Sequence, residues 1–137
     1  MQIISTVLSV DQENIPEVLS VIGASAAIGI SNIPFESTVA ATRVGMVDGE
    51  FVINPTYSEL ENSTLDLVVS GTQSAIVMVE AGSNELTEED MLEALKVGQE
   101  ANVQVIELIN DLVQVSSTPK LVVEAPSEDG AYDKVSD

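Results

Sequence analysis

The segment from Thr87 to about Val113 carries the strongest periodic pattern in the chain and constrains the fold most. Thr87 is followed three residues later by Asp90, the spacing of a helix capping box. Apolar residues then recur at steps of three and four, which predicts one face of a helix of about seven turns. The predicted buried face consists of Ala94, Val97, Ala101, Val105, Leu108 and Leu112. Charged and amide residues take the opposite face, so the helix needs a sheet to lie across.

Two hairpins are predicted ahead of this helix. The first joins strands at residues 38–47 and 50–54 through Asp48-Gly49, a strong hairpin signal because both central positions of a type I′ turn need positive φ. The second joins strands at residues 64–70 and 75–81 around a polar turn. Its predicted core residues are Leu65, Leu67, Val69, Ile76 and Met78. Between the hairpins, Thr56 and Glu59 match a capping box and predict a short helical turn over residues 56–62.

The N-terminal part predicts one strand and one helix. Residues 2–10 are apolar on both faces, as in an interior strand. Asn14, Pro16 and Glu17 supply a cap, an early proline and a first-turn carboxylate, which predict a helix start. The helix extends over residues 18–30, and its small residues at 23–26 would let another element approach closely.

The predicted order is therefore β-α-β-β-β-β-α. Segregated hairpins with two helices indicate an α+β fold, a mixed or antiparallel sheet packed by two helices. We expect one partial domain over residues 1–114, followed by an acidic linker or disordered tail over residues 115–137.

Composition excludes several kinds of chemistry. The 137 residues include no His or Cys, which removes thiol nucleophiles, disulfides and histidine bases. The formal net charge is −19, and the four basic residues are scattered, so the chain by itself is not expected to bind nucleic acid. Residues 18–35 carry no charge, but polar residues and Pro34 make a membrane span a poor interpretation. We expect a cytoplasmic protein, since the N-terminus does not resemble a signal peptide.

Several runs of residues along the chain occur together in one known family. They are Val21-Ile22-Gly23-Ala24-Ser25-Ala26-Ala27, Ile33-Pro34-Phe35, Arg43-Val44-Gly45, Asn54-Pro55-Thr56, Glu59-Leu60, Leu65-Asp66-Leu67-Val68-Val69-Ser70-Gly71-Thr72 and Met78-Val79-Glu80. In this order, they resemble the polyribonucleotide nucleotidyltransferase family, the bacterial polynucleotide phosphorylases. The resemblance covers residues 2–113 and carries specificity because no single motif has to support it.

The resemblance implies a phosphorolytic 3′–5′ exoribonuclease of mRNA degradation. Such enzymes have two RNase PH-like domains joined by a helical segment, then KH and S1-type RNA-binding domains, and form a ring-shaped homotrimer. This chain looks like the later part of the first RNase PH-like domain. RNA would be bound by other parts of the parent, and magnesium and phosphate would serve the parent rather than this segment. No membrane contact is implied, and any degradosome-type protein partner stays unidentified.

Transferring the family's catalytic pattern to this chain argues against a catalytic role. The Ser-rich phosphate-binding turn corresponds here to Asn14-Ile15-Pro16, which lacks hydroxyls and loses an amide donor at the proline. The pattern D-x5-D-x-K corresponds to Leu60, Asp66 and Val68. Asp66, the one matching residue, is interpreted as a strand-edge or hairpin residue rather than a magnesium ligand. We therefore expect no catalytic, cofactor-binding or metal-binding residue in this segment.

Two other features have structural interpretations. Arg43, the sole arginine, could contact RNA or a neighbouring subunit, but an ion pair with one of the 23 acidic residues is the favoured interpretation. Glu88, Glu89 and Asp90 are expected to be a solvated helix start, since acidic residues are favourable near a helix N-terminus.

The leading hypothesis is a non-catalytic scaffold half within the parent enzyme. The alternative is a non-catalytic, acidic RNase PH-like interaction module that binds a basic protein partner. A stand-alone nuclease of the short RNase PH type ranks last because it needs the missing serines and carboxylate-lysine pattern. We also expect exposed apolar sheet surface and self-association when this segment is made alone.

Overall fold

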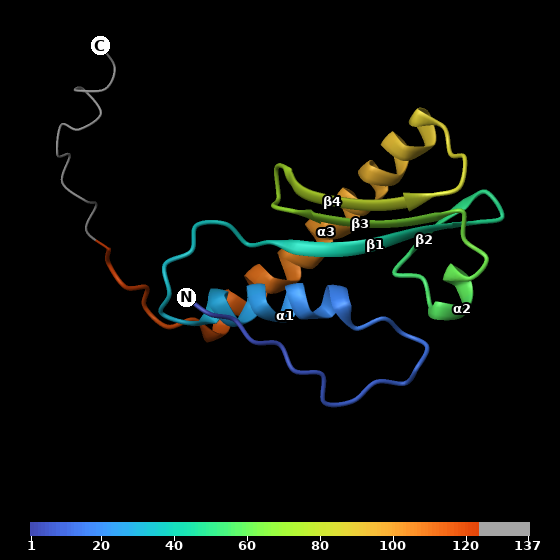
Figure 1. The fold of residues 1–137 in the computed structure, drawn as a ribbon. Helices are drawn as coiled ribbons and strands as arrows, with labels where there is room; N and C mark the ends of the chain where they lie inside the picture. Colours follow the sequence, from blue (N-terminus) through green and yellow to red (C-terminus); the bar gives the residue numbers. More distant parts are fainter. Residues whose placement is uncertain (124–137) are drawn as a thin grey trace, which may run out of the picture.

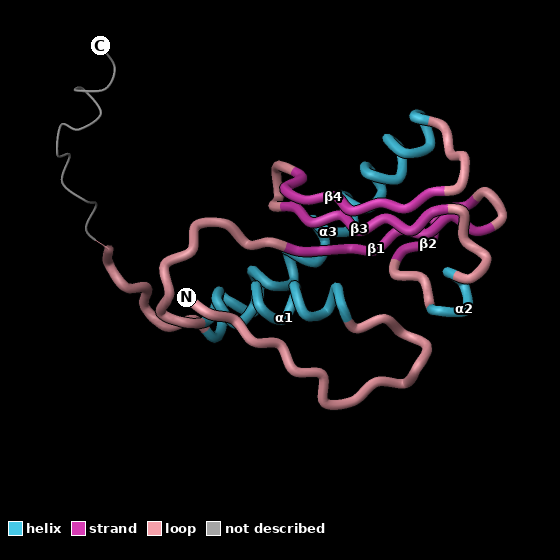
Figure 2. The backbone as a smooth tube through the Cα atoms, in the orientation of Figure 1, coloured by secondary structure: helices cyan, strands magenta, loops and turns pink. Residues whose placement is uncertain are grey.

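The computed structural model describes residues 1–123, which form one antiparallel sheet with helices beside and behind it (Figures 1 and 2). The strand order across the sheet is β2-β1-β3-β4. The strands are β1 (Ala40–Val47), β2 (Glu50–Ile53), β3 (Leu65–Gly71) and β4 (Ile76–Ser83). The helices are α1 (Glu17–Ile30), the short α2 (Tyr57–Leu60) and the long α3 (Glu88–Ser116). The α+β class and the antiparallel sheet packed by helices are confirmed.

Local turn and capping signals produce the elements that the sequence predicted. Asp48 and Gly49 both have positive φ, 51° and 83°, and join β1 to β2. Thr56 and Glu59 form a complete capping box at α2, and these hydrogen bonds lower the pKa of Glu59. Thr87 and Asp90 form the corresponding capping box at the start of α3. The predicted turn and both predicted capping boxes are confirmed.

The core lies where α3 crosses β1 and β3. Its buried residues are Val44, Met46, Leu65, Leu67, Val69 and Ala94. Gly98 of α3 allows a close approach to the sheet, because a Cβ there would lie 3.1 Å from the Cγ2 atoms of both Val44 and Val69. Helix and sheet therefore pack backbone to side chain at this point.

A buried asparagine fixes α3 on the two central strands. The Thr42 hydroxyl donates to Asn102 Oδ1 at 2.8 Å, and Asn102 Nδ2 donates to the Val69 carbonyl at 3.1 Å. Both Thr42 and Asn102 are buried. An unpaired polar group is costly in an apolar core. These two hydrogen bonds therefore favour this position of α3 over positions shifted along the sheet, in which Asn102 would lose its partners.

The buried face of α3 differs from the predicted one. The fully buried residues are Ala94, Gly98, Asn102, Ile106 and Ile109. Of the predicted face, Ala94 is buried, Val97, Ala101 and Val105 are half-buried, and Leu108 and Leu112 are exposed. The predicted face was wrong by a rotation about the helix axis. The reason is that Gly98 and Asn102, which an apolar pattern does not include, are the residues that contact the sheet.

Strand β4 is exposed along its whole length. The predicted core residues Leu65, Leu67 and Val69 are buried, but Ile76 and Met78 are not, and that part of the prediction was wrong. The physical reason is that β4 is an edge strand and that α3 covers β1 and β3 instead. Exposed apolar sheet surface is thus present, as expected.

The N-terminal predictions need two corrections. Residues 2–10 form no strand, because no strand of residues 1–123 pairs with them, and their side chains are exposed. The N-cap of α1 is Pro16, without a side-chain cap. Asn14 is not the cap because its side-chain amide donates to Asp11 instead. Within the small residues 23–26, another segment does approach closely at Ser25, whose Oγ accepts from the Val39 backbone N–H at 3.0 Å, and Gly29 further along α1 meets Val113.

The segment after α3 is docked at its start. The helix extends to Ser116, and Lys120 Nζ donates to the carbonyls of Ile28, Gly29 and Ser31 at 2.8–2.9 Å. A cation at this end of α1 offsets the negative end of the helix dipole. Within the expected tail, residues 124–137 lie outside the described residues. Among residues 1–123, no helix is long and apolar enough to cross a membrane.

Replacing Asn102 tests the polar contact between α3 and the sheet. We expect Asn102→Ala to lower the free energy of unfolding by about 1–3 kcal/mol, because it leaves the Thr42 hydroxyl and the Val69 carbonyl without this partner. Urea denaturation followed by circular dichroism measures the change. Asn110→Ala is the matched control, since Asn110 accepts one hydrogen bond from Thr38 outside the buried core. Equal losses in the two variants would contradict the role given to Asn102.

Replacing an apolar residue of β4 tests whether this edge self-associates. We expect the chain to sediment partly as dimers or larger species, and Val77→Lys to reduce them, because a charge on an edge strand opposes strand pairing. Val122→Lys, at an exposed position outside the sheet, adds the same charge and should change little. A wild-type chain that remains monomeric at high concentration in sedimentation velocity would contradict this expectation.

Candidate functional site

The sole arginine forms the centre of a cluster on the sheet face opposite α3. Thr42 and Val44 point toward α3, so Arg43 between them points to the other face. Asp66 lies on the same face between Leu65 and Leu67, which are buried against α3. Glu17 comes from the first turn of α1. We call Glu17, Arg43 and Asp66 the Arg43 cluster.

Arg43 is held by both carboxylates. Its Nε and Nη2 donate to Asp66 Oδ1 and Oδ2, both at 2.7 Å, and its Nη1 donates to Glu17 Oε2 at 2.7 Å. The Arg43 side chain is 16% exposed, against 46% for Asp66 and 69% for Glu17. The bidentate pair with Asp66 is the stronger geometry. The ion pair predicted for Arg43 is therefore observed, and it ties α1 to β1 and β3.

The cluster is strongly acidic overall. Hydrogen bonding to Asp66 raises the pKa of Arg43, while burial acts in the opposite direction. A concavity of about 320 Å³ adjoins the cluster, and Glu80 of β4 adds a third carboxylate to its lining. Three carboxylates facing one guanidinium leave a net negative site, which disfavours phosphate.

Of the three positions that correspond to the family's catalytic pattern, Asp66 and Val68 lie in β3 beside Arg43. Asp66 stands in β3 between Gly45 and Gly82 of the neighbouring strands, so it is a hairpin residue and not at a sheet edge. Val68 lies two residues further along β3, opposite Glu80. Leu60 is the last residue of α2. Ile15, in the turn before α1 that corresponds to the family's phosphate-binding turn, is buried. Two of the three pattern positions are therefore apolar residues, Leu60 and Val68.

These residues do not fit a magnesium ion with its phosphate. Both carboxylate oxygens of Asp66 already accept hydrogen bonds from Arg43. Within residues 1–123, no group of three or more acidic side chains is arranged to hold a metal ion. Magnesium sites usually combine carboxylates with substrate phosphates. Here the carboxylate of Asp66 is paired with the Arg43 guanidinium instead.

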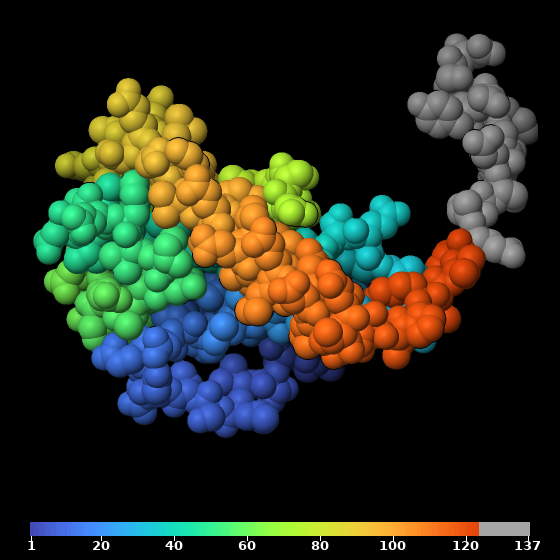
Figure 3. Space-filling model, turned by 180° about the vertical axis from the view of Figure 1, so that it is seen from behind, coloured from blue at the N-terminus to red at the C-terminus, as the bar shows by residue number. Residues whose placement is uncertain are grey.

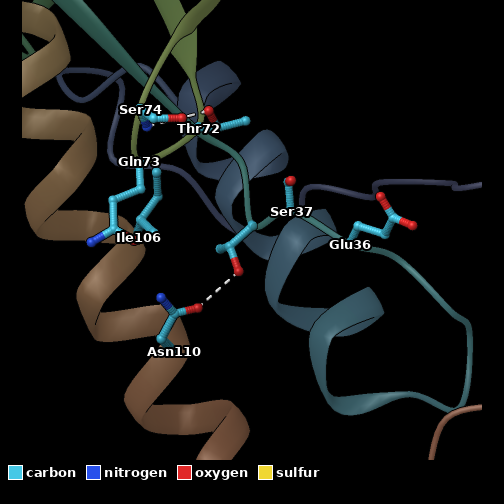
Figure 4. A pocket seen from close by; sticks show the side chains of 8 residues that line it. Glu36, Ser37, Thr72, Gln73, Ser74, Ile106 and Asn110 are labelled. Atoms are coloured by element: carbon cyan, nitrogen blue, oxygen red, sulfur yellow. Dashed lines mark hydrogen bonds between the residues drawn. The ribbon is translucent and has the colours of Figure 1, made fainter.

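A larger concavity of about 430 Å³ lies at the other end of the sheet (Figure 4). It is lined by the loop before β1, the turn between β3 and β4, and the middle of α3. Its residues are Glu36, Ser37, Thr38, Thr72, Gln73, Ser74, Ile106 and Asn110. Thr38 donates to Asn110 Oδ1 at 2.8 Å, which links the loop to α3. Because the lining holds hydroxyls, amides and one carboxylate but no cation, it suits neutral polar groups better than phosphate.

Sequence reasoning found part of this arrangement. It singled out Arg43 and Asp66 separately but did not pair them, and it missed Glu17 as the second partner. The sequence did carry a signal for the pairing. A single arginine among 23 acidic residues is expected to form ion pairs, and Glu17, in the first turn of a predicted helix, is one of the acidic residues available. The polar concavity gave no signal because its residues come from three separate segments.

Replacing Arg43 tests the cluster. We expect Arg43→Met to lower the free energy of unfolding by about 1–2 kcal/mol, a value reduced by solvent screening at the two carboxylates. Arg43→Lys should recover less than half of the loss because lysine lacks the planar fork. Lys96→Met is the matched control, since Lys96 pairs with Glu93 at 3.7 Å between two exposed side chains. Equal effects of Arg43→Met and Lys96→Met in urea denaturation would contradict the structural role.

The chain is similar to known proteins over most of its length. The model for the 3′ exoribonuclease family, domain 2, matches residues 37–101. Polyribonucleotide nucleotidyltransferase from Pelagibacter ubique is 49% identical over 124 residues, which is 90% of this chain and 18% of that protein. The protein of the same name from Geobacter sulfurreducens is 47% identical over 130 residues, 95% of this chain and 19% of the relative. This chain therefore spans about a fifth of the length of these relatives.

A solved structure with a distant sequence has a similar fold. Rice (Oryza sativa) Rrp46 matches with a TM-score of 0.67 and 16% identity, covering 77% of this chain and 51% of that one. At this identity the likeness concerns the fold alone. Residues 37–101 of the chain thus match domain 2 of the 3′ exoribonuclease family, and most of the chain is similar, at 47–49% identity, to one segment of these polyribonucleotide nucleotidyltransferases.

Proposed function

We propose that this chain is a non-catalytic scaffold segment of a polyribonucleotide nucleotidyltransferase, a phosphate-dependent 3′–5′ exoribonuclease of mRNA degradation. The Arg43 cluster carries the proposal: the one carboxylate that matches the catalytic pattern, Asp66, is saturated by a guanidinium from the same sheet. A side chain engaged in this way supports the fold and is not available to a substrate. The segment would belong to the first of the parent's two RNase PH-like domains.

In the parent, the proposed reaction is phosphorolysis. An oxygen of inorganic phosphate attacks the phosphorus of the 3′-terminal phosphodiester, the bond from that phosphorus to the preceding 3′ oxygen breaks, and the oxygen takes up a proton. The products are a nucleoside diphosphate and RNA shortened by one nucleotide. Magnesium and phosphate would act in the other RNase PH-like domain, since the residues of this segment do not fit them. RNA binding, homotrimer formation and a cytoplasmic location are likewise proposed for the parent.

The charge of the segment supports a position away from RNA. The acidic residues Glu89, Glu93, Glu100, Glu107 and Asp111 are exposed along α3. A surface of this sign repels the phosphodiester backbone. Helix α3 and its acidic residues would therefore face the outside of the assembly, while RNA contacts would come from other segments.

The second candidate function is an acidic interaction module that binds a basic protein partner. The observation that favours it is the same charge, −19 over 137 residues, on a fold whose longest helix has one face open to solvent. The two functions are compatible, because a scaffold segment of an enzyme can also recruit a partner. They differ in their tests.

A phosphorolysis assay tests the scaffold proposal. The purified chain, incubated with poly(A), phosphate and magnesium, should release no nucleoside diphosphate above background. The Geobacter sulfurreducens enzyme serves as the positive control. The same assay on a protein expressed from the reading frame extended on both sides should show release. Turnover by the chain alone at a rate comparable with the positive control would refute the scaffold assignment, and an inactive extended protein would refute the assignment of the parent.

A further inference from the structure

Helix α3 carries a second apolar stripe, separate from the face that meets the sheet. Its members are Ala101, Val105, Leu108, Leu112 and Val115, and we call them the α3 outer stripe. Leu108, Leu112 and Val115 are exposed, and Ala101 and Val105 are half-buried. Figure 3 shows α3 running across the surface with no other described segment over it.

The spacing of the stripe is that of a helix–helix seam. Its residues follow one another at steps of four, three, four and three, the alternation of a heptad repeat. The contact of α3 with the sheet uses other positions, among them Gly98 and Asn102. The stripe is therefore not needed to hold α3 on the sheet, and a helix with two apolar faces can pack against two neighbours.

The charge beside the stripe selects the kind of neighbour. Acidic residues follow one border of the stripe, namely Glu93, Glu100, Glu107 and Asp111. Lys96 is the one basic residue of α3, and Glu93 already pairs with it at 3.7 Å. In a second copy of this chain the same acidic border would approach its like, which costs free energy. A helix with lysine or arginine flanking its apolar residues would instead form ion pairs along the seam.

We propose that the α3 outer stripe is a docking surface for an amphipathic, basic helix of a partner protein. Leu108 and Leu112 are the central anchors, and Glu107 and Asp111 meet the partner's cations. This inference rests on the second candidate function, the interaction module, and is independent of RNA phosphorolysis. It gives that module a surface and a partner chemistry.

A synthetic peptide can stand in for the partner. The probe has about three heptads with leucine at the a and d positions and lysine at e and g, labelled for fluorescence anisotropy. We expect the full chain to bind it, and the double variant Leu108→Ser, Leu112→Ser to bind about tenfold more weakly. Leu92→Ser is the matched control: Leu92 is 66% exposed, comparable with 70% for Leu108, but lies on another side of α3. Circular dichroism verifies that all variants are folded.

Four outcomes would overturn the proposal. Equal binding of the peptide by the double variant and the Leu92→Ser control would place the binding elsewhere on the chain. A peptide of the same composition in scrambled order that binds as tightly would reduce the effect to charge alone. A dimer of the chain that the double variant abolishes would make a second copy the occupant. Absence of binding would remove both the surface and the interaction module, and the phosphorolysis assay would be unaffected.

Discussion

The close contact of α3 with β1 and β3 determines the arrangement of the other elements. It depends on Gly98, where a Cβ would lie 3.1 Å from two valine methyl groups, and on Asn102 one turn later, which hydrogen-bonds to both strands. Once α3 is held there, β4 lies outside its cover and α1 packs between α3 and the β1 side of the sheet. The same contact sets which side of α3 faces the solvent, and with it the outer stripe.

The opposite face of the sheet shows how a site can serve folding instead of chemistry. Arg43 takes hydrogen-bond acceptors from two elements, Asp66 in β3 and Glu17 in α1. An arginine whose Nε, Nη1 and Nη2 donors all have carboxylate acceptors has little reason to bind a phosphate, and a carboxylate whose oxygens both accept from it has little reason to bind a cation. The chemistry of the proposed parent would therefore belong to segments outside this chain.

Sequence predicted the features that short-range physics decides. The turn at Asp48-Gly49, the capping boxes at Thr56 and Thr87, and an ion pair for Arg43 each depend on nearby residues or on a shortage of alternatives. The rotation of α3 could not be predicted, because two sets of residues satisfy the same spacing and the true one includes a glycine and an asparagine. The strand expected at residues 2–10 failed for a different reason, since strand formation requires a partner that local sequence does not specify.

The central claim is that the Arg43 cluster is closed by its own carboxylates, and side-chain NMR of Arg43 tests it directly. The chain has one arginine, so its Nε–H signal is unambiguous. We expect this signal to exchange slowly with solvent and not to shift when phosphate and magnesium are added at constant ionic strength. A saturable shift of the Arg43 Nε–H signal on adding phosphate would show that the guanidinium is available to a ligand and would contradict the account.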